Sequence, residues 1–221
     1  MIPALVVVCF ILIVGVAVLG AVKYAKKAQQ NFLALAAQLG LTPVEVVKKI
    51  GIAWSNPSAA GEIRGRPARV FNYSTGSGKS RTQWCAFSVV PRETGGLTFQ
   101  ISTQGLGSKI LQVFGSREIE VGDPAFDAKW FIQTNQPEFL QAALIPELRD
   151  RMTAALSGFG RVRSPSFKLE SNTILYSESA TFGNEFCCGR IAGLREVMMD
   201  LADVAEVFAQ QSKITGKSER S

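Results

Sequence analysis

The sequence predicts an α+β protein: an N-terminal transmembrane helix, then a curved antiparallel sheet that helices cover on one face. Residues 2–22 form one apolar run without a charge. Between residues 62 and 134, apolar and polar side chains alternate with a period of two, which is typical of half-buried antiparallel strands. From residue 137 onward, apolar residues recur every three or four positions in two segments, which indicates amphipathic helices.

The apolar run at residues 2–22 predicts a membrane anchor over residues 1–22. The first charged residue is Lys23, and 21 residues at about 1.5 Å each extend roughly 31 Å, enough to cross a hydrocarbon core about 30 Å thick. A cleaved secretory signal is the alternative, because Gly15-Val16-Ala17 resembles a cleavage site. Such signals have a basic n-region and a shorter apolar stretch, so we expect an uncleaved anchor.

Basic residues follow the apolar run and do not precede it. Eight basic and two acidic residues lie between Lys23 and Val70, so this segment carries the whole net charge of +6. The positive-inside rule therefore predicts a single-pass protein of the plasma (inner) membrane with a cytoplasmic C-terminal domain. Anionic lipid attracts each nearby basic residue by about 1 kcal/mol, and we expect Lys23, Lys26 and Lys27 to contact lipid head groups.

The rest of the chain divides by composition into three parts. Basic juxtamembrane helices are expected over residues 23–55, a cytoplasmic α+β domain over residues 56–212 and a disordered tail over residues 213–221. Lys23–Leu39 is rich in helix-forming residues, so the first helix should continue to Gly40.

A second juxtamembrane helix is predicted directly afterwards. Thr42 resembles an N-cap, Pro43 suits the first helical position, and Glu45 completes a capping box, so this helix should run to about Ile50.

Turn residues and periodicity delimit the elements of the domain. Pro137 should open a helix that Pro146 kinks or restarts, and Ser171-Asn172 should turn a hairpin. A last helix is expected over residues 190–210. Strands are expected at residues 62–73, 82–90, 97–102, 119–121, 129–134, 166–170 and 173–177.

Two segments imitate nucleotide or nucleic-acid motifs. Residues 74–81 read STGSGKSR and supply the second half of a phosphate-binding loop, but Tyr73 occupies the position of the first glycine and a strand follows where a helix is required. Residues 35–47 resemble a helix-turn-helix, but Lys49 falls where an apolar residue is needed and the bilayer is close. We therefore expect neither nucleotide nor nucleic-acid binding.

The sequence offers no catalytic, cofactor or metal site that we can identify. It contains no histidine, which removes the commonest general base and metal ligand. Cys9, Cys85, Cys187 and Cys188 have spacings that suit neither a disulfide framework nor a zinc site. The protein is expected not to be an enzyme.

An acidic segment at residues 118–127, REIEVGDPAFD with its preceding arginine, is the densest carboxylate group. Carboxylates can bind a hard cation, but Asp123-Pro124 is typical of a turn. We expect Gly122, Asp123 and Asp127 to form a structural turn, and keep as an alternative an enzyme of unrecognised type that uses Asp123 and Asp127, or Cys85.

Two short motifs resemble a pattern in uncharacterised bacterial single-span membrane-anchored proteins. They are the GDPAFD of Gly122–Asp127 and the LIPELR of Leu144–Arg149, which match G-D-x-x-F-D and L-x-P-x-L-R. The Gly65-Arg66 pair is also similar. The resemblance implies an anchored globular domain of unknown role without established catalytic residues.

These patterns together predict a single-pass, non-enzymatic binding or accessory protein. Its cytoplasmic domain would contact a membrane protein or anionic lipid. The alternative is an accessory subunit of a larger membrane complex that packs through its transmembrane helix, where Gly15 and Gly20 allow close approach.

Overall fold

The computed structural model describes residues 2–44, 57–103, 117–157 and 162–218. The helices are α1 (Ile2–Leu39), α2 (Pro124–Asp127), α3 (Pro137–Ala143), α4 (Pro146–Ser157), α5 (Glu185–Gly193), α6 (Arg195–Ser218) and the 3₁₀ turn η1 (Gly78–Ser80). The strands are β1 (Thr42–Pro43), β2 (Ser58–Ile63), β3 (Arg66–Thr75), β4 (Thr82–Val89), β5 (Phe99–Thr103), β6 (Arg117–Ile119), β7 (Trp130–Thr134), β8 (Ser166–Glu170) and β9 (Thr173–Glu178).

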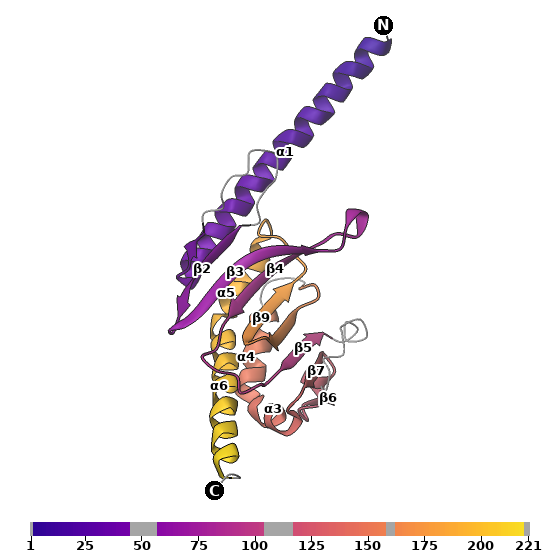
Figure 1. The fold of residues 1–221 in the computed structure, drawn as a ribbon. Coiled ribbons are helices and arrows are strands. Elements are labelled where there is room, and N and C mark those ends of the chain that lie inside the picture. The colour runs from indigo at the N-terminus through magenta and orange to yellow at the C-terminus, as the bar shows by residue number, and fades with distance from the viewer. Residues whose placement is uncertain (1, 45–56, 104–116, 158–161, 219–221) are drawn as a thin grey trace.

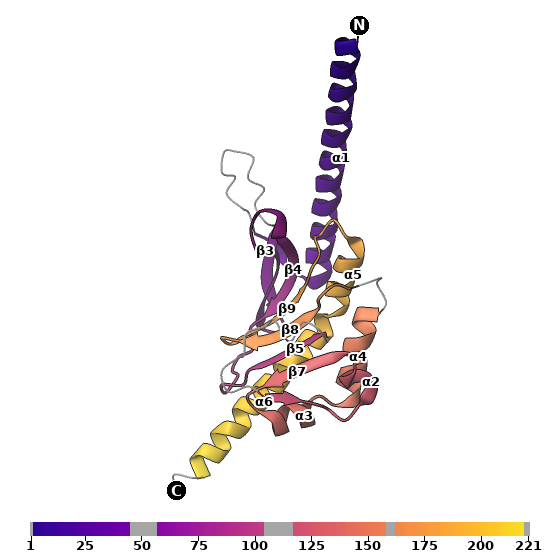
Figure 2. The same cartoon turned by 90° about the vertical axis from the view of Figure 1, so that its right-hand side faces the viewer.

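Within the described ranges, the strands form one nine-stranded sheet in the order β1-β2-β3-β4-β9-β8-β5-β7-β6. Every neighbouring pair is antiparallel. Helices α1, α4 and α5 lie on one side of the strands (Figures 1 and 2), and α6 packs against β4 and β9. The predicted α+β class with an antiparallel sheet is confirmed.

The core lies between the sheet and these helices. Central strands contribute one side of it because their alternate residues point to the same face. Helices α4 to α6 contribute the other side through residues spaced three or four apart. Fully buried members from both sides include Phe87, Ile101, Ile132, Phe167, Ile174, Leu148, Met152, Ile191, Met198 and Leu201.

Helix α1 is one continuous helix of 38 residues, roughly 57 Å long at 1.5 Å per residue. The predicted continuation to Gly40 is confirmed, and Gly40 ends the helix with a positive φ of 71°. The N-terminal part of α1 extends away from the rest of the molecule (Figure 1). Among the described residues, no helix meets the combined length and apolarity that a membrane span requires.

The predicted helix at residues 42–50 is wrong at its start. Thr42 and Pro43 pair with Ala60 and Ala59 as strand β1, and the Val44 N–H donates to the Ser58 carbonyl at 2.8 Å. The edge of β2 offers these residues backbone partners that local capping preference cannot reveal. The remainder of that predicted helix lies outside the described residues.

The chain also departs from the predicted tail at residues 213–221. Helix α6 continues to Ser218, and Lys213 forms an ion pair with Glu93. This contact, 120 residues apart in sequence, supports the helix where composition alone indicated disorder. Residues 219–221 lie outside the described part.

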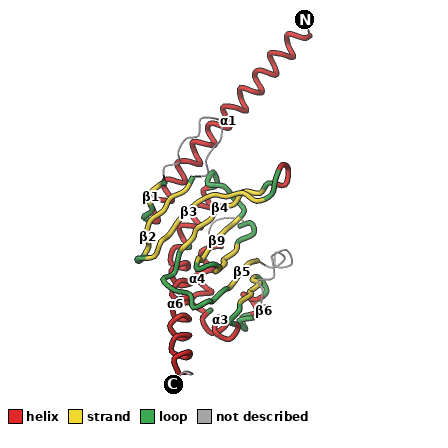
Figure 3. The backbone as a smooth tube through the Cα atoms, viewed as in Figure 1, coloured by secondary structure: helices red, strands yellow, loops and turns green. Residues whose placement is uncertain are grey.

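The remaining differences and agreements between the predicted and the observed elements lie at turns, which Figure 3 shows in green. The single strand predicted over residues 62–73 is two strands, because Arg64 and Gly65 take positive φ of 51° and 69° and form a tight turn. The predicted hairpin at Ser171-Asn172 and the restart at Pro146 are confirmed. The predicted last helix is divided at Leu194 into α5 and α6.

Candidate functional site

Between Leu12 and Val22, α1 exposes the apolar side chains that the structure describes. Six of them are between 43% and 71% exposed: Leu12, Val14, Val16, Val18, Leu19 and Val22. A contiguous apolar surface of this kind on a folded chain indicates contact with lipid or with another protein.

The second half of α1 is packed against the domain. Phe32, Leu35, Ala36 and Leu39 recur at three- and four-residue spacing and are at most 4% exposed. The Phe32 ring lies 5.1 Å from the ring of Phe182, measured between centroids. Asn31 Nδ2 donates to the carbonyl of the same Phe182 at 2.9 Å.

The junction between α1 and the domain begins at Tyr24. The Tyr24 hydroxyl is hydrogen-bonded to Thr181 Oγ1, and its ring lies so close to Gly183 that a Cβ there would overlap it. Lys27 Nζ lies 3.3 Å from Glu185 Oε2. The glycine therefore allows the helix to dock, and polar bonds fix its position along the loop between β9 and α5.

The predicted lipid-contact lysines lie at the same level of α1. Lys23, Lys26 and Lys27 are all exposed. Lys27 forms an ion pair with Glu185, whereas no ion pair joins Lys23 or Lys26 to another described residue. The structure thus leaves these two ammonium groups available at the end of the apolar segment.

A cavity of about 680 Å³ opens beside this junction. We call it the junction cavity; it is lined by Arg81, Thr82, Gln83, Arg163, Ser179, Ala180, Thr181, Asn184, Phe186 and Arg190. Sequence reasoning missed it because its residues come from three separated stretches of sequence, at residues 81–83, 163 and 179–190. Asn184 could have indicated the start of α5, because asparagine is a preferred N-cap residue. Its side chain accepts hydrogen bonds from the backbone N–H groups of Phe186 and Cys187.

One residue of the cavity lining, Arg190, forms a buried ion pair with Glu178. Arg190 is 1% exposed and Glu178 is fully buried; Arg190 donates from Nε at 3.0 Å and from Nη2 at 2.9 Å to Glu178 Oε2. The two charges compensate each other within the protein. Burial raises the pKa of the neighbouring Tyr176 phenol well above its ordinary value.

Three of the four cysteines lie in this buried region. Cys85, Cys187 and Cys188 are free thiols at no more than 8% exposure. Burial raises the pKa of the Cys188 thiol to about 12, and contact with Cys85 together with burial raises that of Cys187 further. A thiol held in its neutral form is a poor nucleophile.

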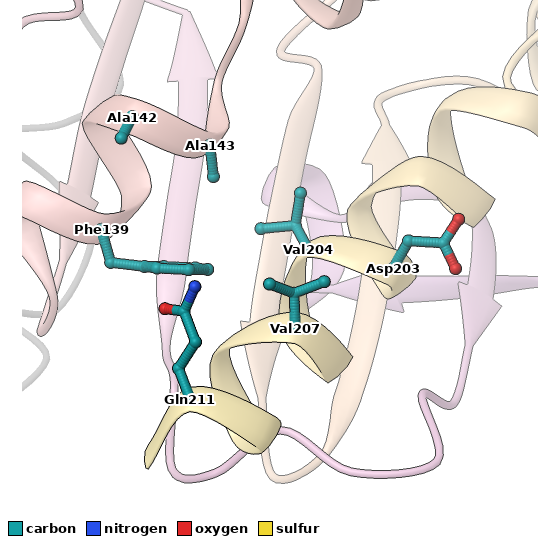
Figure 4. Close-up of a pocket in the computed structure, with 7 residues that line it drawn as sticks. All are labelled: Phe139, Ala142, Ala143, Asp203, Val204, Val207 and Gln211. Carbon is teal, nitrogen blue, oxygen red and sulfur yellow. The ribbon is translucent and has the colours of Figure 1, made fainter. Parts of the chain in front are cut away.

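A second hollow, the α3–α6 groove, lies between α3 and α6 (Figure 4), at the end of the domain away from the start of α1 (Figure 1). It has a volume of about 490 Å³ and is lined by Phe139, Ala142, Ala143, Asp203, Val204, Val207 and Gln211. Phe139 closes it from one side, with its ring 4.9 Å from that of Phe208. The lining is mostly apolar and includes two polar side chains, those of Asp203 and Gln211.

The acidic turn at Gly122, Asp123 and Asp127 is tied to its own backbone. The Asp127 carboxylate accepts N–H groups of Val121, Gly122 and Asp123 at 2.9, 3.0 and 3.1 Å. Asp123 caps α2, and its Oδ2 lies 3.5 Å from Arg149 Nε. In the described part of the chain, no group of three or more metal-ligating side chains is assembled to hold an ion.

The phosphate-loop imitation is part of a hairpin. Residues 76–81 contain η1 and connect β3 to β4, whose tip extends beyond the sheet (Figure 1). Strand β4 follows directly, so the loop does not lead into a helix as a phosphate-binding loop does. Its Arg81 instead reaches the junction cavity.

Together these features define a class of protein: a single antiparallel sheet backed by helices, with one long N-terminal helix that leaves the domain. No family model and no curated protein matches the chain. The fold is similar to the crystal structure of the mycobacterial trehalose monomycolate transport factor A, TtfA, with a TM-score of 0.50 and 10% identity. The match covers 80% of this chain and 93% of that chain, and at this identity it shows a common fold.

Proposed function

We propose that this chain is a single-pass membrane-anchored accessory protein. Its N-terminal helix spans the plasma (inner) membrane, and its α+β domain faces the cytoplasm and binds a membrane-protein partner at the bilayer surface. The observation that carries the proposal is the exposed apolar half of α1, which continues without a break into a half that is packed on the domain.

The anchor follows from the whole of residues 2–22 together with the exposure of their described side chains. No charge interrupts this segment, and its length of roughly 31 Å matches the hydrocarbon core. Because the helix is continuous and clamped at Tyr24 and Asn31, insertion of its first half would hold the domain at a fixed height.

An accessory role is supported by what the domain offers. It provides two hollows and a charged junction, and its acidic turn and buried thiols are committed to internal bonds. The structural neighbour TtfA is described as a transport factor for trehalose monomycolate. A similar fold in a factor that assists transport supports an assisting role here, without transferring its cargo.

Packing of α1 against other spans is the second form of the proposal. A Cβ built at Gly15 or Gly20 would meet no atom within 4 Å, so both glycines are open for a neighbouring helix. Small residues permit such close approach in membranes.

Two measurements test the proposed topology and partner. With Cys9→Ser removing the remaining thiol, Ser80→Cys places a label on the exposed hairpin tip, because Cys85, Cys187 and Cys188 are buried. We expect an impermeant maleimide to label it only after cells are permeabilised; labelling of intact cells would contradict the cytoplasmic assignment. Photocrosslinkers at Val16 and Lys26, in membranes, should then identify a protein partner through the span or at the bilayer surface, and adducts with lipid alone at both positions would overturn the accessory role.

A further inference from the structure

The position of the junction cavity relates it to the head-group layer. Tyr24 lies two residues beyond Val22, about 3 Å along the helix axis, and it bonds Thr181, which lines the cavity. The head-group layer of one leaflet is about 5–7 Å thick. Figure 2 shows the β3–β4 hairpin tip and the loop before α5 at the end of the domain from which α1 projects. The cavity mouth is therefore at the depth of lipid phosphates if the apolar half of α1 is in the bilayer.

The charge of the cavity is positive. Three arginines line it and no carboxylate does. Glu178 neutralises Arg190, which leaves the guanidinium groups of Arg81 and Arg163 in excess. Neither of these two forms an ion pair with any residue in the described ranges. Arginine binds phosphate oxygens through two parallel N–H donors, whereas lysine acts as a point charge. Two guanidinium groups without an ion pair therefore suit a phosphate better than two lysines would.

A side-chain hydrogen bond holds the Arg81 guanidinium, and a backbone hydrogen bond holds the segment that carries Arg163. Arg81 Nη2 donates to Ser74 Oγ at 3.0 Å and keeps its other donors. The Arg163 carbonyl accepts from the Ser179 N–H at 2.9 Å, which ties the start of that segment to the cavity wall. The hydroxyl of Thr181 and the amide of Gln83 add neutral donors to the same lining.

Exposed aromatic side chains lie in the cavity lining and next to it, which a soluble anion would not require: Phe186 lines the cavity, and Tyr24 is hydrogen-bonded to the lining residue Thr181. Phe186 and Tyr24 are each 53% exposed at this end of the domain. Aromatic side chains with one polar end are typical of the membrane interface. Two exposed arginines and an exposed phenylalanine in one cavity lining match the two parts of a phospholipid, a charged phosphate and the start of its acyl chains.

We propose that the junction cavity binds the phosphate head group of an anionic phospholipid, with Arg81 and Arg163 as the phosphate ligands and Phe186 beside the acyl chains. This inference rests on the proposed function, since it requires α1 in the membrane. The proposal goes beyond a general attraction between the basic segment and anionic lipid, because it predicts one binding site that holds one lipid per chain.

The test uses the full chain in detergent micelles, with bound lipid counted by native mass spectrometry during titration with phosphatidic acid, phosphatidylcholine or inorganic phosphate. We expect one phosphatidic acid per chain at low concentration. Arg81→Gln with Arg163→Gln should weaken it at least tenfold. The matched control, Arg117→Gln with Lys213→Gln, removes two positive charges from β6 and α6 and should change binding less than twofold.

The other outcomes of this titration would contradict the proposal in different ways. Equal binding of phosphatidylcholine, or equal loss in the control pair, overturns recognition by the two arginines. Competition by inorganic phosphate as strong as that of the lipid assigns the cavity to a soluble anion. Phe186→Ser provides an independent variant. It should weaken the binding of phosphatidic acid and leave any binding of inorganic phosphate unchanged. Unchanged binding of phosphatidic acid with weakened binding of inorganic phosphate would contradict the proposal. A chain that stays in membranes but shows no arginine-dependent lipid binding removes this inference alone, whereas a chain found outside membranes removes the anchor.

Discussion

The two halves of helix α1 belong to one unbroken element but have opposite surroundings. Between Leu12 and Val22 the described side chains are exposed and include six large apolar ones, whereas the half from Tyr24 to Leu39 has one buried stripe and an exposed remainder that mixes polar residues with alanines and Leu33. A stripe of this kind is explained by the domain that covers it. The uniform half has no such partner within the described chain.

This difference shows which part of the helix is completed by the fold and which part requires something outside it. Apolar surface that stays exposed is unfavourable by about 25 cal/mol for each Å², so the first half of α1 needs lipid or another helix. The second half fixes where the domain begins. The boundary between them, at Tyr24, is where the junction cavity lies.

The largest effect should come from the buried half. Leu35 is 1% exposed, and its truncation in Leu35→Ala leaves a cavity between α1 and α5, at a cost of about 2–5 kcal/mol of unfolding free energy. Val18→Ala, in the exposed half, should change the stability of the domain by less than about 0.5 kcal/mol. Chemical denaturation of both variants in the same detergent measures the difference, and equal effects would show that the two halves are not distinct.

An intermediate effect is expected at the boundary. Gly183→Val places a side chain where the Tyr24 ring lies, and overpacking of this kind costs about 1–3 kcal/mol. Tyr24→Ala should relieve most of that penalty, because it removes the overlapping ring. A double-mutant cycle gives the coupling; additive losses would mean that Tyr24 does not pack on this glycine. Gly20→Val, which meets no atom, is the control.

A smaller effect on the free energy of unfolding should follow from a change of pH. It should arise from Arg66 in β3 and Glu206 in α6 and not from α1. The Arg66 side chain is 5% exposed and the Glu206 side chain 14%; the hydrogen bond from Arg66 lowers the pKa of Glu206 below its ordinary value of 4.5. The stabilisation is therefore complete above pH 4.5 and is lost as pH falls through the lower folded pKa. Denaturation between pH 7 and pH 3 should show a weaker pH dependence in Glu206→Gln than in the wild type, and identical curves would contradict this assignment.

Local signals predicted much of the fold. Ser171 and Asn172 indicated their hairpin because both residues accept positive φ, and the prolines at positions 137 and 146 indicated both helix starts. The turn at Arg64-Gly65 was missed, although the buried apolar positions change from odd (Ile63) to even (Ala68 and Val70) across it. Strand order was not predictable, since β4 pairs with β9 although about 90 residues separate them in sequence.

The junction cavity was out of reach for the same reason. Arg81 was recognised only as part of a loop, and no local pattern connects it to Arg163 or to Thr181. Its assembly depends on the β4–β9 pairing and on the docking of α1, with Tyr24 and Thr181 157 residues apart. The apolar character of residues 2–22, in contrast, is a property of the sequence alone.

Alkaline carbonate extraction of membranes that contain the full chain tests the anchor most directly, because it releases peripheral proteins and retains spanning ones. We expect the wild-type chain in the membrane pellet. Val14→Lys with Val16→Lys adds two charges near the centre of the span, each costing about 2.5–3.5 kcal/mol, and should move the chain to the supernatant with its domain folded. A wild-type chain released by carbonate would contradict the account.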